Sequence, residues 1–181
     1  MKQRSVGQSS WSVDEDAVKR EGRWSLLLRP ISFLFMLALF ALYFIEPLGS
    51  EWLHVSLPWK LRLLGGFLSL GGTLMLVLTH RALSIHWSTT LQFKEGHSLI
   101  TTGPYGLIRH PMYTSLYIIF IGLAIVSSFW PLWILILLMT IFFFRIASIE
   151  EDMMIDKFGD EYVSYIKRSG RFLPRLRRRN Y

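Results

Sequence analysis

The sequence predicts an all-α fold, a polytopic transmembrane helical bundle of about four spans. Of its 181 residues, 51% are hydrophobic and 15% are aromatic, which is more apolar surface than a soluble domain of this length can bury. The net charge of +7 comes mostly from Arg and Lys near the two ends of the chain, while the middle is nearly uncharged. We therefore expect the excess of apolar side chains to face lipid.

Four apolar stretches are candidates for the spans, since a helix needs about 20 apolar residues, within a range of about 17–25, to cross a bilayer. The apolar run of the first, residues 30–45, is preceded by Arg20, Arg23 and Arg29, the second is followed by Arg81 and Lys94, and an Arg-rich tail follows the last. Because positive residues flank spans on the cytoplasmic side, both termini are expected in the cytoplasm. The predicted spans are residues 26–45, 61–79, 111–128 and 131–148.

The spans divide the chain into a short tail and one membrane-embedded domain. Residues 1–25 are polar and charged, without the apolar core of a signal peptide, and predict a cytosolic tail. Residues 26–181 form the predicted domain, in which residues 80–110 are a cytosolic loop and residues 149–181 an interfacial C-terminal segment. Two glycine pairs in the second span predict close helix packing, Gly65 with Gly66 and Gly71 with Gly72.

The loop GHSLITTGPYGLIRHP, residues 96–111, is rich in turn formers and hydrogen-bonding side chains. Pro111 suits the first position of a helix, and His110 before it is biased away from helix, so the third span is expected to begin near Pro111. A helix N-terminus offers unpaired N–H groups and a partial positive charge. With Arg109 and His110 beside it, this N-terminus is a candidate site for a carboxylate or phosphate.

Acidic residues gather where the fourth span ends, at Glu150, Glu151 and Asp152. The negative end of a helix dipole disfavours acidic residues unless the helix continues, so something is expected to compensate them. A ligand with an ammonium group or ribose hydroxyls would do so, and so would Arg145. The alternative is a solvated helix extension that ends at Gly159, which composition alone favours; His110 alone is likewise more often a helix cap than a catalytic residue.

Several common binding chemistries have no signature in the sequence. There is no GxGxxG, P-loop or HExxH motif and no cysteine, so no metal is expected. The histidines are scattered rather than paired at metal-ligand spacing. The basic tail is interpreted as an anchor to anionic membrane lipids rather than to nucleic acid, because the domain before it is lipid-embedded.

Three ordered motifs, taken together, resemble a known family. They are GHSLITTGPYGLIRHPMY, the acidic pair after a transmembrane hairpin, and FGDEYVSYIKRSGRFLP, which together cover about residues 87–174. The combination is similar to the isoprenylcysteine carboxyl methyltransferase and phospholipid N-methyltransferase superfamily of integral membrane enzymes. The resemblance implies an S-adenosylmethionine-dependent methyltransferase with a cytosolic C-terminal cofactor-binding region. Methyl transfer of this kind needs no metal, because holding donor and acceptor in contact supplies much of the rate.

The resemblance also assigns candidate site residues. For catalysis it implies two basic residues, Arg109 and Arg145, the second near the position of an arginine that orients the acceptor. This sequence departs from the family pattern at Ser115, where Gly is usual, and at Gly106, where a basic or aromatic residue is common. The first departure concerns helix packing and the second the acceptor pocket. The implied cofactor-binding residues are His97, Ser98, Leu99, Ile100, Tyr105, His110, Pro111, Met112, Tyr113, Glu150 and Glu151.

The expected function is therefore methyl transfer from S-adenosylmethionine to a lipophilic or membrane-accessible acceptor, resembling either an isoprenylcysteine carboxylate or a phospholipid amine. One alternative is an NADPH-dependent membrane reductase of the steroid or sterol type, which has a similar His-Pro-x-Tyr hairpin. Glu150 and Glu151 disfavour it, because carboxylates would repel a 2′-phosphate. Another alternative is a small non-enzymatic membrane adaptor, which the scarcity of polar residues within the spans disfavours.

Overall fold

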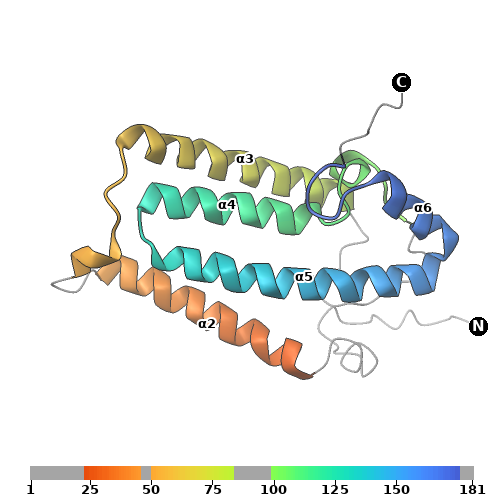
Figure 1. Cartoon of the computed structure of the whole chain (residues 1–181), viewed down its shortest axis with the longest axis horizontal. Helices are drawn as coiled ribbons and strands as arrows, with labels where there is room; N and C mark the ends of the chain where they lie inside the picture. Colours follow the sequence, from red (N-terminus) through yellow and green to blue (C-terminus); the bar gives the residue numbers. More distant parts are fainter. Residues whose placement is uncertain (1–22, 46–49, 84–98, 176–181) are drawn as a thin grey trace, which may run out of the picture.

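The computed structural model of the protein describes residues 23–45, 50–83 and 99–175. These residues form no strand, only two isolated backbone bridges, so the predicted all-α fold is confirmed. Figure 1 shows α3, α4 and α5 running along the long axis of the molecule, with α2 tilted beside α5. The elements in chain order are α2 (Arg23–Ile45), η1 (Ser50–Leu53), α3 (Trp59–Leu83), η3 (Gly103–Gly106), α4 (Pro111–Ser127), α5 (Pro131–Phe158) and α6 (Asp160–Arg168).

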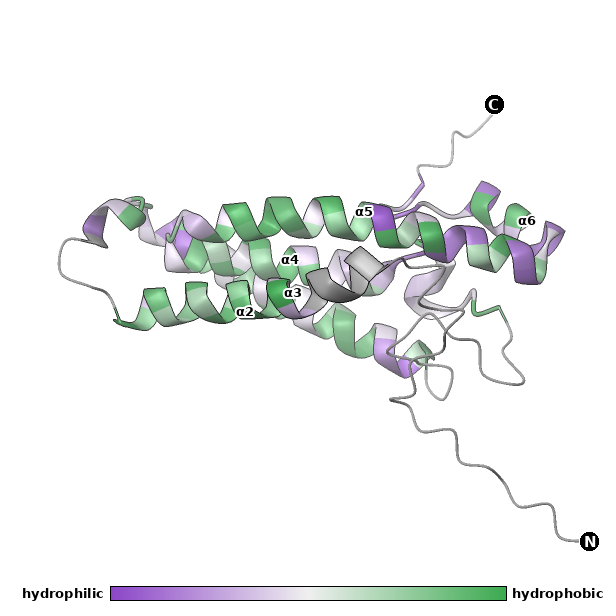
Figure 2. Cartoon of the chain, turned by 90° about the horizontal axis from the view of Figure 1, so that it is seen from below, coloured by the Kyte–Doolittle hydropathy of each residue, from purple (hydrophilic) through white to green (hydrophobic). Residues whose placement is uncertain are grey.

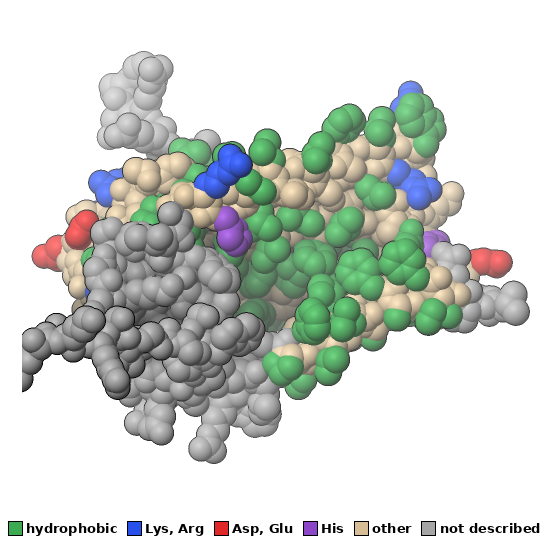
Figure 3. Space-filling view, turned by 180° about the vertical axis from the view of Figure 1, so that it is seen from behind, with side chains coloured by type: hydrophobic (Ala, Val, Ile, Leu, Met, Phe, Trp, Pro, Cys, Tyr) green, Lys and Arg blue, Asp and Glu red, His purple; other side chains and the backbone are tan. Residues whose placement is uncertain are grey.

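Each of the four predicted apolar stretches coincides with one helix. By length and composition α3 and α5 could cross a membrane, whereas the apolar part of α2, Pro30–Ile45, and the whole of α4 are shorter. Figure 2 shows apolar residues along these helices and hydrophilic ones gathered at α6 and the adjoining end of α5. Apolar side chains also cover much of the surface seen in Figure 3. The four-span topology and the side on which each terminus lies stay predictions.

The α3–α4 interface is held close by glycines. Gly65 and Gly72 of α3 and Gly122 of α4 are buried, and a Cβ at Gly122 would collide with Ser69 and the Gly65 carbonyl. The Ser69 hydroxyl also donates a hydrogen bond across the interface, 2.9 Å from the oxygen of Ile119. One glycine of each predicted pair thus makes the close approach, while a Cβ at Gly71 would meet nothing within 4 Å.

The turn between α4 and α5 closes one end of the bundle. Val55 donates its backbone N–H to the oxygen of Ser128 at 2.8 Å, and Trp130 donates to the oxygen of Leu53 at 3.1 Å. An apolar cluster beneath this turn unites α2, η1, α4 and α5. Its buried members are Leu39, Leu53, Ala124, Phe129, Leu132, Leu135 and Ile136.

The opposite end of the bundle is formed by an extension of α5. The helix continues past residue 148, where the sequence predicts the end of the fourth span, to Phe158. Gly159 then adopts a positive φ of 51°, which favours glycine, and separates α5 from α6. Glu150 and Glu151 therefore lie inside a continuous helix, as the helix-extension interpretation expected, and not at its negatively polarised end.

The chain after α6 folds back onto the loop that precedes α4. We call residues 169–175 the C-terminal strap. Gly170 donates its N–H to the oxygen of Leu107 at 3.1 Å, and Arg109 donates to the oxygen of Gly170 at 2.8 Å. His110 donates in turn to the oxygen of Arg171 at 3.0 Å. The strap thus fixes the backbone of Arg109 and His110 at the start of α4.

Candidate functional site

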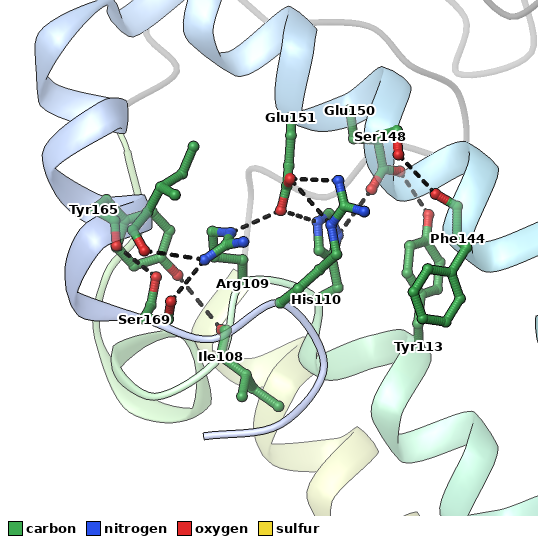
Figure 4. Close-up of polar contacts among 12 residues, drawn as sticks. Ile108, Arg109, His110, Tyr113, Phe144, Ser148, Glu150, Glu151, Tyr165 and Ser169 are labelled. Carbon is green, nitrogen blue, oxygen red and sulfur yellow. Dashed lines mark hydrogen bonds and ion pairs between the residues drawn. The ribbon is translucent and has the colours of Figure 1, made fainter. Parts of the chain in front are cut away.

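Four parts of the chain meet at this end of the bundle: the loop before α4, the first turn of α4, the extension of α5 and the C-terminal strap (Figure 4). Pro111 is buried and occupies the first helical position of α4, as predicted. His110 directly precedes it, and both Arg109 and His110 direct their side chains at the acidic pair on α5. Residues far apart in sequence thereby form one network of charges.

Glu151 lies at the centre of this network. Its Oε1 accepts from Nε of Arg109 at 2.7 Å and from Nε2 of His110 at 3.2 Å. Its Oε2 accepts from Nε of Arg171 at 3.1 Å and from Nη2 at 2.6 Å. A carboxylate offers about four acceptor positions, so these contacts use all of them. With a side chain only 10% exposed, Glu151 has no acceptor capacity left for a ligand.

Glu150 differs from its neighbour in both capacity and exposure. Its Oε1 accepts from the Tyr113 hydroxyl at 2.6 Å, and its Oε2 lies 3.2 Å from Nδ1 of His110. Two of about four acceptor positions are therefore unused, and the side chain is 27% exposed. The Tyr113 ring stacks on Phe143 with centroids 4.5 Å apart, which fixes the hydroxyl that holds Glu150. Glu150 is therefore the carboxylate available to a ligand.

His110 connects the two carboxylates. Its side chain is 7% exposed, and each ring nitrogen lies 3.2 Å from a carboxylate oxygen, one from Glu150 and one from Glu151. Burial alone would lower the pKa of His110, but the hydrogen bonds to Glu150 and Glu151 outweigh it, and the pKa is raised above its ordinary value. Because a neutral imidazole has only one N–H, two carboxylate partners require the protonated ring.

This arrangement predicts a pH dependence of stability. A raised pKa in the folded state means that protonated His110 stabilises the fold fully below its unfolded pKa of about 6.5. That contribution is lost as the pH rises from there through the folded pKa. We expect the melting temperature of the wild type to fall over this window relative to that of His110→Gln, and His80→Gln, on the exposed part of α3, to follow the wild type. Parallel curves for wild type and His110→Gln between pH 6 and 9 would contradict the prediction.

Arg109, one of the two predicted catalytic residues, is engaged by protein partners. Besides Glu151, it contacts the carbonyl oxygens at the end of α6 through Nη1, at 2.7 Å from Ser169 and 3.3 Å from Ile166. Its side chain is 9% exposed. This geometry favours a function in fixing α6 against α4, which the sequence did not predict.

Arg145, the other predicted catalytic residue, is exposed on α5. Among the described residues it takes no part in the ion pairs around Glu150 and Glu151. Its function in orienting an acceptor stays a prediction.

The remaining predicted residues precede α4 in the chain or belong to its first turn. Leu99, Ile100, Tyr105 and Met112 are half-buried, and His97 and Ser98 lie outside the described residues. The Tyr105 carbonyl oxygen accepts from the Tyr165 hydroxyl at 2.5 Å, which joins the loop to α6. Burial of its ring, with Glu150 nearby, raises the pKa of Tyr105 well above its ordinary value, so its hydroxyl stays protonated.

The two departures from the family pattern also have definite surroundings. Ser115 is fully buried in α4, and its hydroxyl donates to the oxygen of Pro111 at 2.7 Å, so the extra polar group has a partner within the helix. At Gly106 a Cβ would lie 3.3 Å from the oxygen of Thr101, a tight contact within the loop. A larger side chain there would require the loop to shift.

Sequence reasoning missed the strap residue Arg171. It belongs to the third family motif, but nothing in its spacing separates it from the other arginines near the C-terminus. The sequence did indicate that the acidic pair needs a positively charged partner. Arg171 is one of the side chains that provide that charge. Within the described part of the chain, no group of three or more His, Asp or Glu side chains is arranged to hold a metal ion.

Comparisons with known proteins place this chain in a family. The family model for phospholipid methyltransferase matches residues 61–161, more than half of the chain, which therefore belongs to this family of membrane methyltransferases. The nickel-cobalt-cadmium resistance protein NccN of Alcaligenes xylosoxydans xylosoxydans is 28% identical over 83 residues, covering 46% of this chain and 39% of that protein.

A solved structure shows the same fold. The eukaryotic intramembrane Ras methyltransferase, isoprenylcysteine carboxyl methyltransferase, superposes with a TM-score of 0.67 at 22% sequence identity. The superposition covers 80% of this chain and 52% of that one. The chain thus spans about half the length of this relative, and the matching part includes a comparable helical bundle.

Proposed function

We propose that this protein transfers a methyl group from S-adenosylmethionine to a lipophilic acceptor that reaches the site from the membrane. The observation that carries the proposal is the state of the Glu150 carboxylate, which is partly exposed and has two hydrogen-bond acceptor positions unused. Tyr113 and His110 hold this carboxylate at the end of an apolar hairpin. Membership of the phospholipid methyltransferase family supports the reaction class.

The residues at this end fit the proposed cofactor. Bound S-adenosylmethionine would supply an electrophilic methyl group on a sulfonium. The two unused acceptor positions of Glu150 suit donors such as an ammonium group or ribose hydroxyls. The half-buried side chains of Leu99, Ile100 and Tyr105 would provide apolar and aromatic contacts nearby, as ligand sites commonly do. His110, held between two carboxylates, would keep Glu150 correctly oriented.

The lipophilic acceptor is supported by the surroundings of the site. Large apolar side chains are exposed along α3 and α5, including Leu137, Ile141 and Phe144 on the helix that carries Glu150. A soluble protein would bury such side chains, whereas a membrane protein exposes them to lipid. An acceptor dissolved in the bilayer could therefore approach the polar end of α5 without leaving an apolar environment.

A cytosolic position of the site is part of the same proposal. The α2–α3 connection and the α4–α5 turn meet at one end of the bundle, and the network around Glu151 lies at the other. The Arg and Lys residues that flank the spans support a cytosolic assignment for the end with the network, with both termini on that side. A soluble cofactor would then reach the site directly from the cytosol.

A ligand comparison tests the proposed function. We expect S-adenosylhomocysteine to raise the melting temperature of the detergent-purified protein, because a ligand that binds only the folded state adds about 2.7 kcal/mol at 100 times its Kd. NADPH at the same concentration is the matched control and should cause no shift. A shift with NADPH and none with S-adenosylhomocysteine would favour the reductase alternative and overturn the proposal.

A further inference from the structure

The C-terminal strap brings to the site a charged side chain to which the proposed function gives no part. Arg171 makes two charge-assisted hydrogen bonds to Oε2 of Glu151, at 2.6 Å from Nη2 and 3.1 Å from Nε. Its side chain is 30% exposed, against 10% for Glu151. Arg171 thus approaches the network from outside and occupies the two acceptor positions that Arg109 and His110 leave unused.

A continuous chain of contacts leads from Arg171 to the carboxylate that is available to a ligand. Glu151 binds Arg171 through Oε2 and His110 Nε2 through Oε1, the latter at 3.2 Å. The opposite ring nitrogen of His110 lies 3.2 Å from Oε2 of Glu150. The orientation of Glu150 therefore depends on that of the imidazole, which depends on Glu151 and its partner Arg171.

The same strap also holds His110 through its backbone and through an aromatic ring. The His110 N–H donates to the carbonyl oxygen of Arg171 at 3.0 Å. The Phe172 ring lies 5.7 Å from the imidazole, and the Thr114 hydroxyl donates to the Phe172 oxygen at 2.8 Å. The strap thus fixes the backbone of His110, and the two carboxylates that contact the ring nitrogens set the rotation of the imidazole.

We propose that Arg171 is a positioning residue of the cofactor site, acting through Glu151 and His110 on Glu150. This inference rests on the proposed function, because it assumes that Glu150 contacts the ligand. Arg171 satisfies the second oxygen of Glu151, so that the first oxygen stays directed at Arg109 and His110. Without Arg171, the Glu151 carboxylate can rotate so that Oε1 no longer faces His110. The imidazole that contacts Glu150 then loses its hydrogen bond to Glu151.

The test is the affinity of folded Arg171→Gln for S-adenosylhomocysteine, measured by titration calorimetry at a temperature well below unfolding. Arg175→Gln is the matched control, because Arg175 lies in the same strap and is exposed, and its guanidinium donates to the carbonyl oxygens of Ile166 and Lys167 rather than to the acidic pair. We expect Kd to rise about tenfold for Arg171→Gln, which is the usual consequence when a ligand loses one charged hydrogen bond, here the bond to a displaced Glu150. For Arg175→Gln we expect Kd to stay at the wild-type value.

Arg171→Lys separates positioning from mere attachment of the strap. Lysine keeps the charge but cannot reproduce the two guanidinium contacts, so an intermediate Kd is expected. If Arg171→Gln does not fold, the comparison of Arg171→Lys with Arg175→Lys decides, and equal Kd values overturn the inference. A lower melting temperature with an unchanged Kd would also overturn it. Failure of the wild type itself to bind S-adenosylhomocysteine would instead reject the proposed function.

Discussion

Glu151→Gln is expected to lower the free energy of unfolding by about 3–5 kcal/mol, the usual cost of removing one partner of a buried charge network. The carboxylate accepts four contacts from Arg109, His110 and Arg171, and its side chain is only 10% exposed. The amide of glutamine has one carbonyl oxygen, and its NH₂ group would face donors. Three positively charged side chains would then lack most of their compensation.

The neighbouring substitution Asp152→Asn is the control for this result. Asp152 is exposed on the next position of α5, and replacing an exposed charge usually changes stability by less than about 0.5 kcal/mol. Thermal or denaturant unfolding in the same detergent would compare the two variants. Equal stability of Glu151→Gln and Asp152→Asn would show that the network contributes little to the fold.

Glu150→Gln is expected to have the opposite profile, with a stable fold and weaker binding of S-adenosylhomocysteine. The substitution keeps the size of the side chain but removes the charge that would pair with a ligand donor, which costs about 1–3 kcal/mol of binding free energy. Glu150 is 27% exposed and makes two protein contacts, so its loss should disturb the fold less than that of Glu151.

Glu161→Gln provides the matched control for binding, because Glu161 is an exposed carboxylate on α6. Titration calorimetry on all three proteins gives Kd directly, and thermal unfolding without ligand shows whether each is folded. If Glu150→Gln binds as tightly as the wild type while folded, the ligand-facing function of Glu150 is wrong. The family assignment, which rests on the match over residues 61–161, would be unaffected.

Much of the fold could be predicted from local sequence. The four apolar runs gave the positions of α2 to α5, because helix length and apolar content are local properties of the chain. Pro111 gave the start of α4 for the same reason, since a proline at the first helical position forfeits no hydrogen bond. Gly159 likewise gave the end of α5.

Other features depended on contacts that no local pattern contains. Gly65 and Gly66 are equivalent in the sequence, yet only Gly65 faces a colliding backbone on α4, because the rotation of α3 against α4 is set by packing of whole helices. Composition favoured a solvated helix extension for the acidic pair, but it could not show that Glu151 is buried while Glu150 is partly exposed.

What the sequence by itself determined is the class of protein, the all-α fold, and the loop and helix ends that carry the polar residues. Tertiary structure decided how the two carboxylates of the acidic pair differ. Protein donors occupy all acceptor positions of Glu151, whereas Glu150 keeps acceptor positions for a ligand. It also brought Arg171 to Glu151 and left the side chain of Arg145 exposed on α5. The physical reason is that the hydrogen-bond partners of a side chain are its neighbours in space, which can be distant in the sequence. Arg109 and Glu151 are 42 residues apart in the chain, yet Nε of Arg109 lies 2.7 Å from Oε1 of Glu151.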